Sequence, residues 1–231
     1  MEKESKNFSE TAYLRVKEYL LHSDIYPGQK IPHLELGKRL RISLTPLRES
    51  FVRLSTEGLL SHQNQKGFFV PKISLEEAKE LYEIRELIEP YMAEKAAQSM
   101  TEDQMNSLLD ILNEYKKLIA GPYTRQRLLV DKRFHVEIAK WSGNKKLSQI
   151  LDRIYDQIII KRQIMHLPSH RGQAAYKEHL EVFKSLEKRD GKKAAALMKD
   201  HIRTGRDFVM GHIEQREEFE FMNMLRPIKS S

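Results

Sequence analysis

The sequence predicts a mostly α-helical protein in two parts: a shorter N-terminal part with one small β-hairpin, and a longer part that is entirely helical. Gly and Pro are most frequent before residue 75, where the segments between them are short, and the chain after that point consists of long amphipathic stretches. We therefore place a boundary at residues 71–74 and expect two domains within the 231 residues.

Composition indicates a soluble protein without disulfides. Hydrophobic residues make up 40% and charged residues 32% of the chain, and cysteine is absent. No apolar run approaches the length that spans a bilayer, and the opening MEKESKNFSE lacks the apolar core of an export signal. We expect a cytoplasmic protein with no membrane partner. The net charge of +7 is densest in residues 1–73, with 12 Lys/Arg against 8 Asp/Glu, which favours a polyanionic partner.

Three short helices are expected in the N-terminal part. The first is TAYLRVKEYLLHS (residues 11–23), whose apolar side chains repeat at helical spacing, and a Pro-Gly turn follows it. The second is HLELGKRL. The third has Thr45 as its expected N-cap and Pro46 in its first helical position, and Gly58 is placed to end it.

A two-stranded hairpin is expected next, because LLSHQ and FFVPKI flank the turn NQKG. A short helix, a tight turn and a second capped helix form the helix-turn-helix pattern, and the hairpin would be a wing beside it. In that pattern the second helix enters the major groove of DNA. The residues that would reach DNA are Ser43, Leu44, Thr45, Arg48 and Arg53 in this helix and Lys66 and Gly67 in the wing.

Arg48 has the strongest chemical reason to read a base, because its guanidinium can donate two hydrogen bonds to O6 and N7 of guanine. Ser43, Thr45 and the free N–H groups at the helix start can donate to phosphate. The pattern alone leaves a second interpretation open, namely three small helices with an ordinary charged face.

The remainder of the chain is expected to be helical throughout. Ser74 with Glu77 and Thr101 with Gln104 have the spacing of capping boxes, and Pro90 is expected to kink the helix that it interrupts. The expected helices cover about residues 75–98, 101–119, 123–141, 144–163, 173–188 and 192–220.

The segment DKRFH places Asp131 and His135 one helical turn apart on the same face. A second pair exists, since His179 lies 11 residues before Asp190 and His201 lies 11 residues after it. If the flanking helices form an antiparallel hairpin, both histidines lie about 16 Å from the turn, at the same level. The four side chains would then suit zinc, and also nickel, manganese or iron. A hydrogen-bonded core histidine is the alternative for each position.

The N-terminal motifs together resemble the winged helix-turn-helix of the GntR family of bacterial transcription regulators. The matching features are the Pro-Gly turn, the segment SLTPLRES, the EGL ending and the wing sequence GFFV, in this order between residues 10 and 73. One position departs from the family pattern. The residue after Ser43 is usually arginine in this family and is Leu44 here, which implies an operator that differs from the family's common sequence.

Residues 75–220 resemble the all-helical effector domain, called the FCD domain, of the FadR-type branch of this family. The resemblance is carried by Arg85, Glu89, Asp131, Phe134, His135, Glu178, His179, Leu180, Asp190 and His201. Members with this pattern bind a divalent metal through the matching aspartate and histidines. The resemblance therefore implies the same ligand role for Asp131, His135, His179 and His201, with zinc as the first candidate.

The resemblance also implies small organic acids as effectors, and Arg85 is a candidate to hold the carboxylate of such an acid. Spacing alone equally allows an ion pair between Arg85 and Glu89. We expect a homodimeric repressor that binds a near-palindromic operator, and not an enzyme. The alternatives are a metal-dependent enzyme and a regulator whose metal is purely structural. The expected domains are a winged helix-turn-helix at 8–73, an effector-binding and dimerisation domain at 74–222 and a mobile tail at 223–231.

Overall fold

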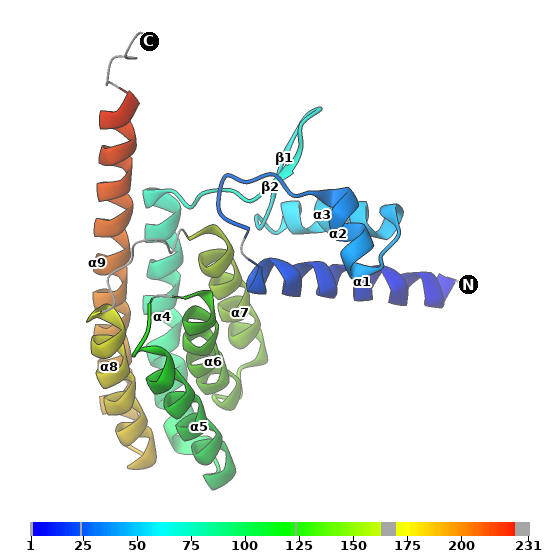
Figure 1. Ribbon diagram of the computed structural model, residues 1–231. Helices are drawn as coiled ribbons and strands as arrows, with labels where there is room; N and C mark the ends of the chain where they lie inside the picture. The colour runs from blue at the N-terminus through cyan, green and yellow to red at the C-terminus, as the bar shows by residue number, and fades with distance from the viewer. Residues whose placement is uncertain (1, 24, 123, 163–169, 225–231) are drawn as a thin grey trace. The chain divides into compact units, whose positions relative to one another are not determined.

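The computed structural model describes residues 2–23, 25–122, 124–162 and 170–224. In these residues it contains nine α-helices and one two-stranded sheet, which confirms the predicted fold class (Figure 1). The N-terminal elements are α1 (Glu2–His22), α2 (His33–Leu40), α3 (Leu44–Thr56), β1 (Ser61–Gln63) and β2 (Gly67–Phe69). The others are α4 (Leu75–Ser99), α5 (Glu102–Leu118), α6 (Arg125–Trp141), α7 (Lys145–Lys161), α8 (His170–Glu187) and α9 (Gly191–Met224). None of the described helices is long and apolar enough to cross a membrane.

The chain divides into two compact units. The first contains residues 1–73 with 124–132 and 152–165, and the second contains residues 74–123, 133–151 and 166–231. Helices α6 and α7 are each continuous and contribute residues to both units.

Helices α2 and α3 of the first unit form the helix-turn-helix. Arg41 follows α2 in the left-handed conformation with φ 51°, and its N–H donates to the Lys38 carbonyl at 3.2 Å. The Ile42 N–H donates to the Gly37 carbonyl at 2.9 Å. A Cβ on Gly37 would lie 3.2 Å from both Ile42 O and Leu47 Cδ2. Glycine at this position therefore permits the close approach of the turn and α3 to α2.

The start of α3 differs from the expectation. Ser43 is the N-cap and the helix begins at Leu44, so the prediction of Thr45 as N-cap was wrong. Thr45 and Pro46 lie inside the first turn. Proline is accepted throughout a first turn, because the N–H groups there have no partner within the helix, so Pro46 indicates the turn but not its first residue. The helix ends shortly before Gly58, whose φ of 73° suits glycine.

The predicted hairpin is present beside α3. Its strands pair antiparallel in the register Ser61–Phe69, His62–Phe68 and Gln63–Gly67. Phe68 packs against Phe51 of α3 with ring centroids 5.1 Å apart, and this contact fixes the wing relative to that helix. Lys66 is exposed in the turn of the wing, and Gly67 has φ 98°.

One hydrophobic core stabilises the first unit. Its buried members are Tyr13, Val16, Leu20, Ile31, Leu36, Leu47, Phe51, Leu54, Leu59, Leu60, Val70 and Ile160. The α6 segment of this unit is held by Arg125, which donates to the carbonyl of Leu20 (2.7 Å) near the end of α1 and to that of Ile25 (3.1 Å) after it. The structure therefore includes short segments of α6 and α7 in the unit that contains the helix-turn-helix.

Helices α4 and α9 of the second unit run antiparallel, side by side (Figure 1). Glu86 of α4 pairs with Arg203 of α9 at 2.7 Å, while Glu94 lies against Gly191, the first residue of α9. A Cβ on Gly191 would lie 2.8 Å from the carbonyl oxygen of Glu94. A larger residue at this position would push the start of α9 away from α4.

A tight turn joins α8 to α9. Arg189 adopts the left-handed conformation with φ 59°, and its N–H donates to the Leu186 carbonyl at 3.0 Å. The carboxylate of Asp190 accepts a hydrogen bond from the Lys193 N–H at 3.1 Å and so caps the start of α9. The predicted helical hairpin, with its break at Asp190-Gly191, is confirmed.

Both ends of the chain are more helical than expected. Helix α1 begins at Glu2 and not at residue 11, because the polar residues before residue 11 form helix without an apolar repeat that periodicity could detect. Helix α9 continues to Met224, so the assignment of residues 223 and 224 to a tail was wrong. Residues 225–231, the rest of that expected tail, lie outside the described residues.

We expect Thr101→Ala to lower the free energy of unfolding of the metal-free protein by about 1 kcal/mol. The Thr101 hydroxyl accepts from the Gln104 N–H (3.3 Å), and the Gln104 side chain accepts from the Thr101 N–H (3.0 Å), so the mutation leaves an N–H at the start of α5 without its acceptor. Urea unfolding followed by circular dichroism measures the loss. Ser107→Ala in the same helix is the control, because its hydroxyl only donates to the Asp103 carbonyl. Equal losses in both variants would contradict the capping role.

Candidate metal centre and nucleic-acid interface

The outward face of α3 carries the residues predicted to reach DNA. Ser43, Leu44, Thr45 and Arg48 are all exposed, and Leu44 exposes 57% of its surface. Val52, two turns after Leu44, is also exposed on this helix. Aliphatic side chains can contact the methyl group of thymine, and the guanidinium of Arg48 can pair with guanine. This face therefore combines the two kinds of group that read base edges in the major groove.

Arg53 lies in a different environment from the other predicted DNA contacts. Its guanidinium pairs with Glu10 of α1 at 2.5 Å and lies 3.6 Å from the centre of the Tyr13 ring. Glu57 is a further partner at 3.4 Å. These contacts tie α1 to α3, and the contact of Arg53 with DNA remains a prediction.

A groove between α3 and the wing lies next to Arg48. His33, His62 and Gln65 also line it, and the His62 ring packs on Phe68 at 4.7 Å between centroids. Sequence reasoning missed these three polar residues as candidate DNA contacts. Their position at the start of α2 and in the hairpin was available from the sequence, but nothing distinguished them from other exposed polar side chains.

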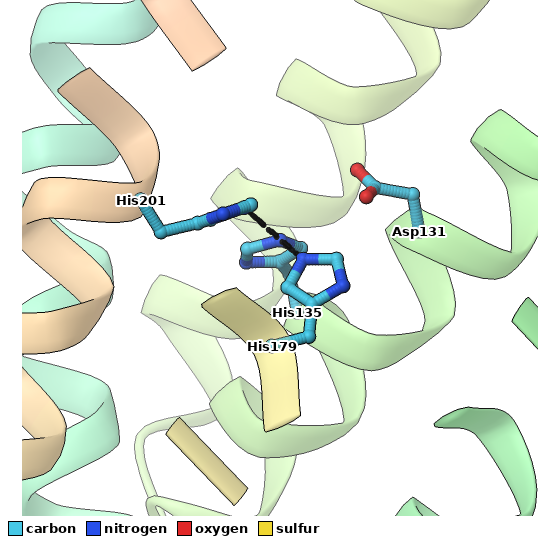
Figure 2. Close-up of side chains that lie close together, drawn as sticks. All are labelled: Asp131, His135, His179 and His201. Carbon is cyan, nitrogen blue, oxygen red and sulfur yellow. Dashed lines mark hydrogen bonds between the residues drawn. The ribbon is translucent and has the colours of Figure 1, made fainter. Parts of the chain in front are cut away.

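Three histidines meet inside the second unit. His135 comes from α6, His179 from α8 and His201 from α9, and they expose only 1%, 0% and 5% of their surface. Their Nε2 atoms form a nearly equilateral triangle, with sides of 3.2 Å, 3.1 Å and 3.2 Å. Figure 2 shows the rings turned toward one another. The structure thus brings together three imidazoles that lie up to 66 residues apart in the chain.

Two carboxylates determine which nitrogen carries the hydrogen in two of these rings. Glu89 Oε2 lies 2.5 Å from His135 Nδ1, and Glu178 Oε2 lies 2.6 Å from His201 Nδ1. An ionised carboxylate can only accept, so both Nδ1 atoms must donate. In the neutral rings each Nε2 then carries a lone pair, and the lone pairs converge. Such lone pairs repel one another unless a cation, or a hydrogen on Nε2 of His179, lies between them.

Glu89 is ionised because of its neighbours. Burial raises the pKa of Glu89, but the charges of Arg85 and His135 and the hydrogen bonds from them outweigh burial and lower the pKa from 4.5 to about 2. Arg85 is itself buried, and its Nε donates to Glu89 Oε1 at 2.6 Å. Of the two roles open to Arg85 from the sequence, the structure shows the ion pair with Glu89. Its role as an effector anchor remains a prediction.

Glu178 has an equivalent arrangement on α8. Both of its oxygens accept from Arg171, each at 2.9 Å, and Oε2 also accepts from His201. Burial raises the pKa of Glu178, while the hydrogen bonds from His201 and Arg171 and their charges lower it to about 2. Sequence reasoning missed Arg171, because a charged residue one or two turns from a ligand is usually a solvated one.

His179 is held by aromatic packing. Its ring lies 4.3 Å from the ring of Phe134 and 5.4 Å from that of Tyr115. Burial, followed by the charges of His201 and His135, lowers the pKa of His179 well below its ordinary value. The ring is therefore neutral near pH 7, which is the state in which an imidazole binds a metal.

Asp131 supplies a fourth side chain, one turn before His135 on the unbroken helix α6. Its ligand atom and those of the three histidines all lie within 4.8 Å of one another, and its carboxylate faces the rings in Figure 2. Two nitrogens bound to one ion lie about 3.4 Å apart at a tetrahedral angle and about 2.9 Å apart at a right angle. The observed Nε2 spacing of 3.1–3.2 Å lies between these values, so the donor set fits a divalent first-row ion.

We expect the stability of the metal-free protein to depend on Glu89 in a pH-dependent way. The pKa of Glu89 is about 2 in the folded protein and near 4.5 when unfolded, so its contribution is present above pH 4.5 and is lost as the pH falls toward 2. Urea unfolding of wild type and Glu89→Gln between about pH 5.5 and 3.5 measures this. The difference in free energy of unfolding between wild type and Glu89→Gln should narrow as the pH falls. A difference that stays constant would contradict the lowered pKa of Glu89.

Two family models match the chain. The model described as "Bacterial regulatory proteins, gntR family" matches residues 8–70, and the model described as "FCD domain" matches residues 80–204. The first covers α2, α3 and the whole hairpin, and the second covers all four residues of the candidate metal centre. The FCD domain is a metal-binding type of effector domain.

Similar proteins are transcription regulators. The chain is 31% identical over 187 residues to the Nta operon transcriptional regulator of Aminobacter aminovorans, covering 80% of this chain and 86% of the relative. It is 27% identical to the HTH-type transcriptional repressor RspR of Escherichia coli, covering 82% of this chain and 83% of the relative. The solved structure of E. coli McbR/YncC shares the fold with a TM-score of 0.79 at 16% identity. The match covers 89% of this chain and 98% of that one. These similarities indicate a transcription regulator and not an enzyme.

Proposed function

Because the chain belongs to the GntR family of bacterial regulatory proteins and carries an FCD domain, we propose that it is a repressor that senses a small organic acid at a divalent metal ion. One observation carries the proposal: three imidazole Nε2 atoms and a carboxylate converge inside the effector domain of a chain that also has a winged helix-turn-helix. Repression is supported by the name of the E. coli relative, a transcriptional repressor.

The DNA-binding step uses α3 and the wing. A two-fold homodimer would place two copies of α3 in successive major grooves, so the operator is near-palindromic, with half-sites about one helical turn apart. Arg48 reads a base, Leu44 packs on a base edge, and Ser43, Thr45 and Lys66 contact the phosphates. The exposure of these side chains supports this assignment.

The metal is held by Asp131, His135, His179 and His201. The three histidines are buried and Asp131 is partly buried, and the hydrogen bonds from Nδ1 of His135 and His201 would aim the Nε2 lone pairs of these rings at a bound ion. When bound, the ion supplies a Lewis acid that accepts carboxylate oxygens. Imidazole and carboxylate ligands at this spacing suit zinc, with nickel, manganese or iron as alternatives.

The acid binds through the metal in this proposal. Four protein ligands leave positions open on an ion of higher coordination number, and a carboxylate can fill them. Arg85 was the other candidate anchor, but its Nε already donates to Glu89. We therefore assign the first contact with the acid to the ion, and any contact of Arg85 with the acid is secondary to it.

A structural metal is the second candidate function. Nearly complete burial of all three histidines favours it, because closed structural sites hold their ion away from solvent. In this case the ion stabilises the effector domain and no acid binds. The two candidates differ in whether an acid adds stability beyond that of the metal.

The experiment is a thermal-shift screen of mono-, di- and tricarboxylates and hydroxy acids on the full chain, loaded with Zn²⁺ or treated with chelator. A ligand that binds only the native state raises the melting temperature by mass action. An acid that stabilises the zinc-loaded protein and loses its effect after chelation supports the sensor. Stabilisation by zinc alone, with no added effect of any acid, supports the structural site and contradicts the sensor.

A further inference from the structure

We propose that Glu89 and Glu178 are positioning residues that set the metal affinity of the centre by fixing the orientation and tautomer of His135 and His201. The inference rests on the proposed metal site and deepens it. Neither glutamate is a ligand in this account. Each acts on the ion only through the histidine ring that it holds.

Both carboxylates lie on the side of the ring opposite the ligand nitrogen. Glu89 Oε2 contacts Nδ1 of His135 and Glu178 Oε2 contacts Nδ1 of His201, whereas the triangle is formed by the Nε2 atoms. A group bonded to Nδ1 cannot reach an ion at Nε2 of the same ring. It does, however, fix the hydrogen on Nδ1, stop rotation of the ring and raise the basicity of Nε2.

Each carboxylate is itself fixed by an arginine. Glu89 accepts a hydrogen bond from Arg85 with one oxygen and from His135 with the other, so it links the two side chains. The two oxygens of Glu178 accept hydrogen bonds from the two terminal guanidinium nitrogens of Arg171. The structure thus contains two relays with the same order of groups: Arg85–Glu89–His135 between α4 and α6, and Arg171–Glu178–His201 between α8 and α9.

The arginines give the relays two properties that a lone glutamate would lack. They neutralise the carboxylates, so that each pair adds no net charge beside the ion. They also occupy the oxygens that are not bonded to histidine, which prevents the carboxylate from turning toward the metal. These two glutamates near the centre therefore position ligands and do not compete with Asp131 for the ion.

The two relays differ in their exposure to water. The side chain of Glu89 exposes 2% of its surface and that of Glu178 exposes 27%. Water can replace a lost carboxylate partly at Glu178 but not at Glu89. Removal of the charge should consequently weaken metal binding more at Glu89 than at Glu178.

The test compares the Zn²⁺ affinity of the full chain and its variants by competition with a chromogenic chelator. We expect Glu89→Gln to weaken binding about 10–100-fold and Glu178→Gln to weaken it by a smaller factor. Cobalt(II) loading gives a second readout, since a reoriented ring changes the visible absorption of the bound ion. Unchanged Zn²⁺ affinity in both variants overturns the inference.

Matched controls are available one turn away on the same helices. Glu86 of α4 pairs with Arg203, and Glu181 of α8 pairs with Lys184, and these pairs involve no histidine of the centre. Glu86→Gln and Glu181→Gln should retain wild-type Zn²⁺ affinity. A loss in these variants as large as in Glu89→Gln would mean that any charge change on these helices weakens binding, which overturns the inference.

Two further measurements separate the failure modes. If Glu89→Gln has a lower melting temperature in chelator but wild-type Zn²⁺ affinity, Glu89 serves only to pair Arg85 and the inference fails. Should Glu89→Gln not fold, the Glu178→Gln variant, at a position with 27% side-chain exposure, still tests the claim. Failure of the metal site itself has a different signature, because His179→Ala would then keep wild-type metal binding. In that case the proposed function fails and not the relay alone.

Discussion

His179→Ala is expected to lower Zn²⁺ affinity by about 100-fold or more, since it removes one of four ligands from a site whose binding free energy is about 10–16 kcal/mol in comparable four-ligand zinc sites. His179 is the fully buried member of the triangle, and its Nε2 lies 3.2 Å and 3.1 Å from the other two nitrogens. Elemental analysis after dialysis should show about one metal per chain in wild type and much less in the variant.

The variant should also lose metal-dependent stability. A metal at 100 times its dissociation constant raises the free energy of unfolding by about 2.7 kcal/mol, and this increment should be absent in His179→Ala. His212→Ala on α9 is the control and should keep the metal, because His212 is not part of the candidate centre. His179→Gln repeats the test with a side chain that leaves a smaller cavity. Full metal occupancy in both His179 variants would show that the cluster does not bind the ion.

Arg48→Ala is expected to weaken operator binding by about 1–3 kcal/mol for each half-site. Arg48 is exposed in the second turn of α3, where a guanidinium can donate two hydrogen bonds to guanine. A base contact predicts that the loss falls on the specific operator and leaves binding to random duplex almost unchanged. Fluorescence anisotropy with both duplexes measures this.

The salt dependence and a control variant complete this test. A phosphate contact would weaken binding to both duplexes alike. It would also reduce the slope of log affinity against log salt concentration by about 1, so it is distinguishable from base reading. Arg133→Ala is the control, since Arg133 is exposed and pairs with Glu114 in the second unit. Unchanged operator affinity in Arg48→Ala would remove Arg48 from the reading surface.

The clustering of the four candidate ligands could be predicted from the sequence because their positions follow from regular helical structure. Equal distances of His179 and His201 from Asp190 place both histidines at one level of a helical hairpin, and the structure brings their Nε2 atoms within 3.1 Å. Asp131 and His135 share a helix face for a similar reason. Helical periodicity is a strong constraint, and a tight turn marked by Asp190-Gly191 fixes the register of the two helices.

The supporting groups of the centre could not be located in the same way. Glu89 and Arg171 are charged residues in helices rich in charge, and only tertiary packing shows that they are buried against the histidines. The start of α3 was missed by two residues because Ser43 and Thr45 are both good caps and Pro46 is accepted throughout the first turn. Patterns of local sequence specify elements, whereas burial decides the role of their polar side chains.

The central claim, that an acid acts on DNA binding through the metal, is tested most directly by operator affinity. The measurement is anisotropy of a labelled operator titrated with zinc-loaded protein, with and without a stabilising acid, and repeated after chelation. Coupling between two sites typically changes affinity about 5–150-fold, and we expect a change in this range for the zinc-loaded protein and none after chelation. An acid that changes operator affinity equally with and without metal, or that leaves it unchanged in the zinc-loaded protein, would contradict the account.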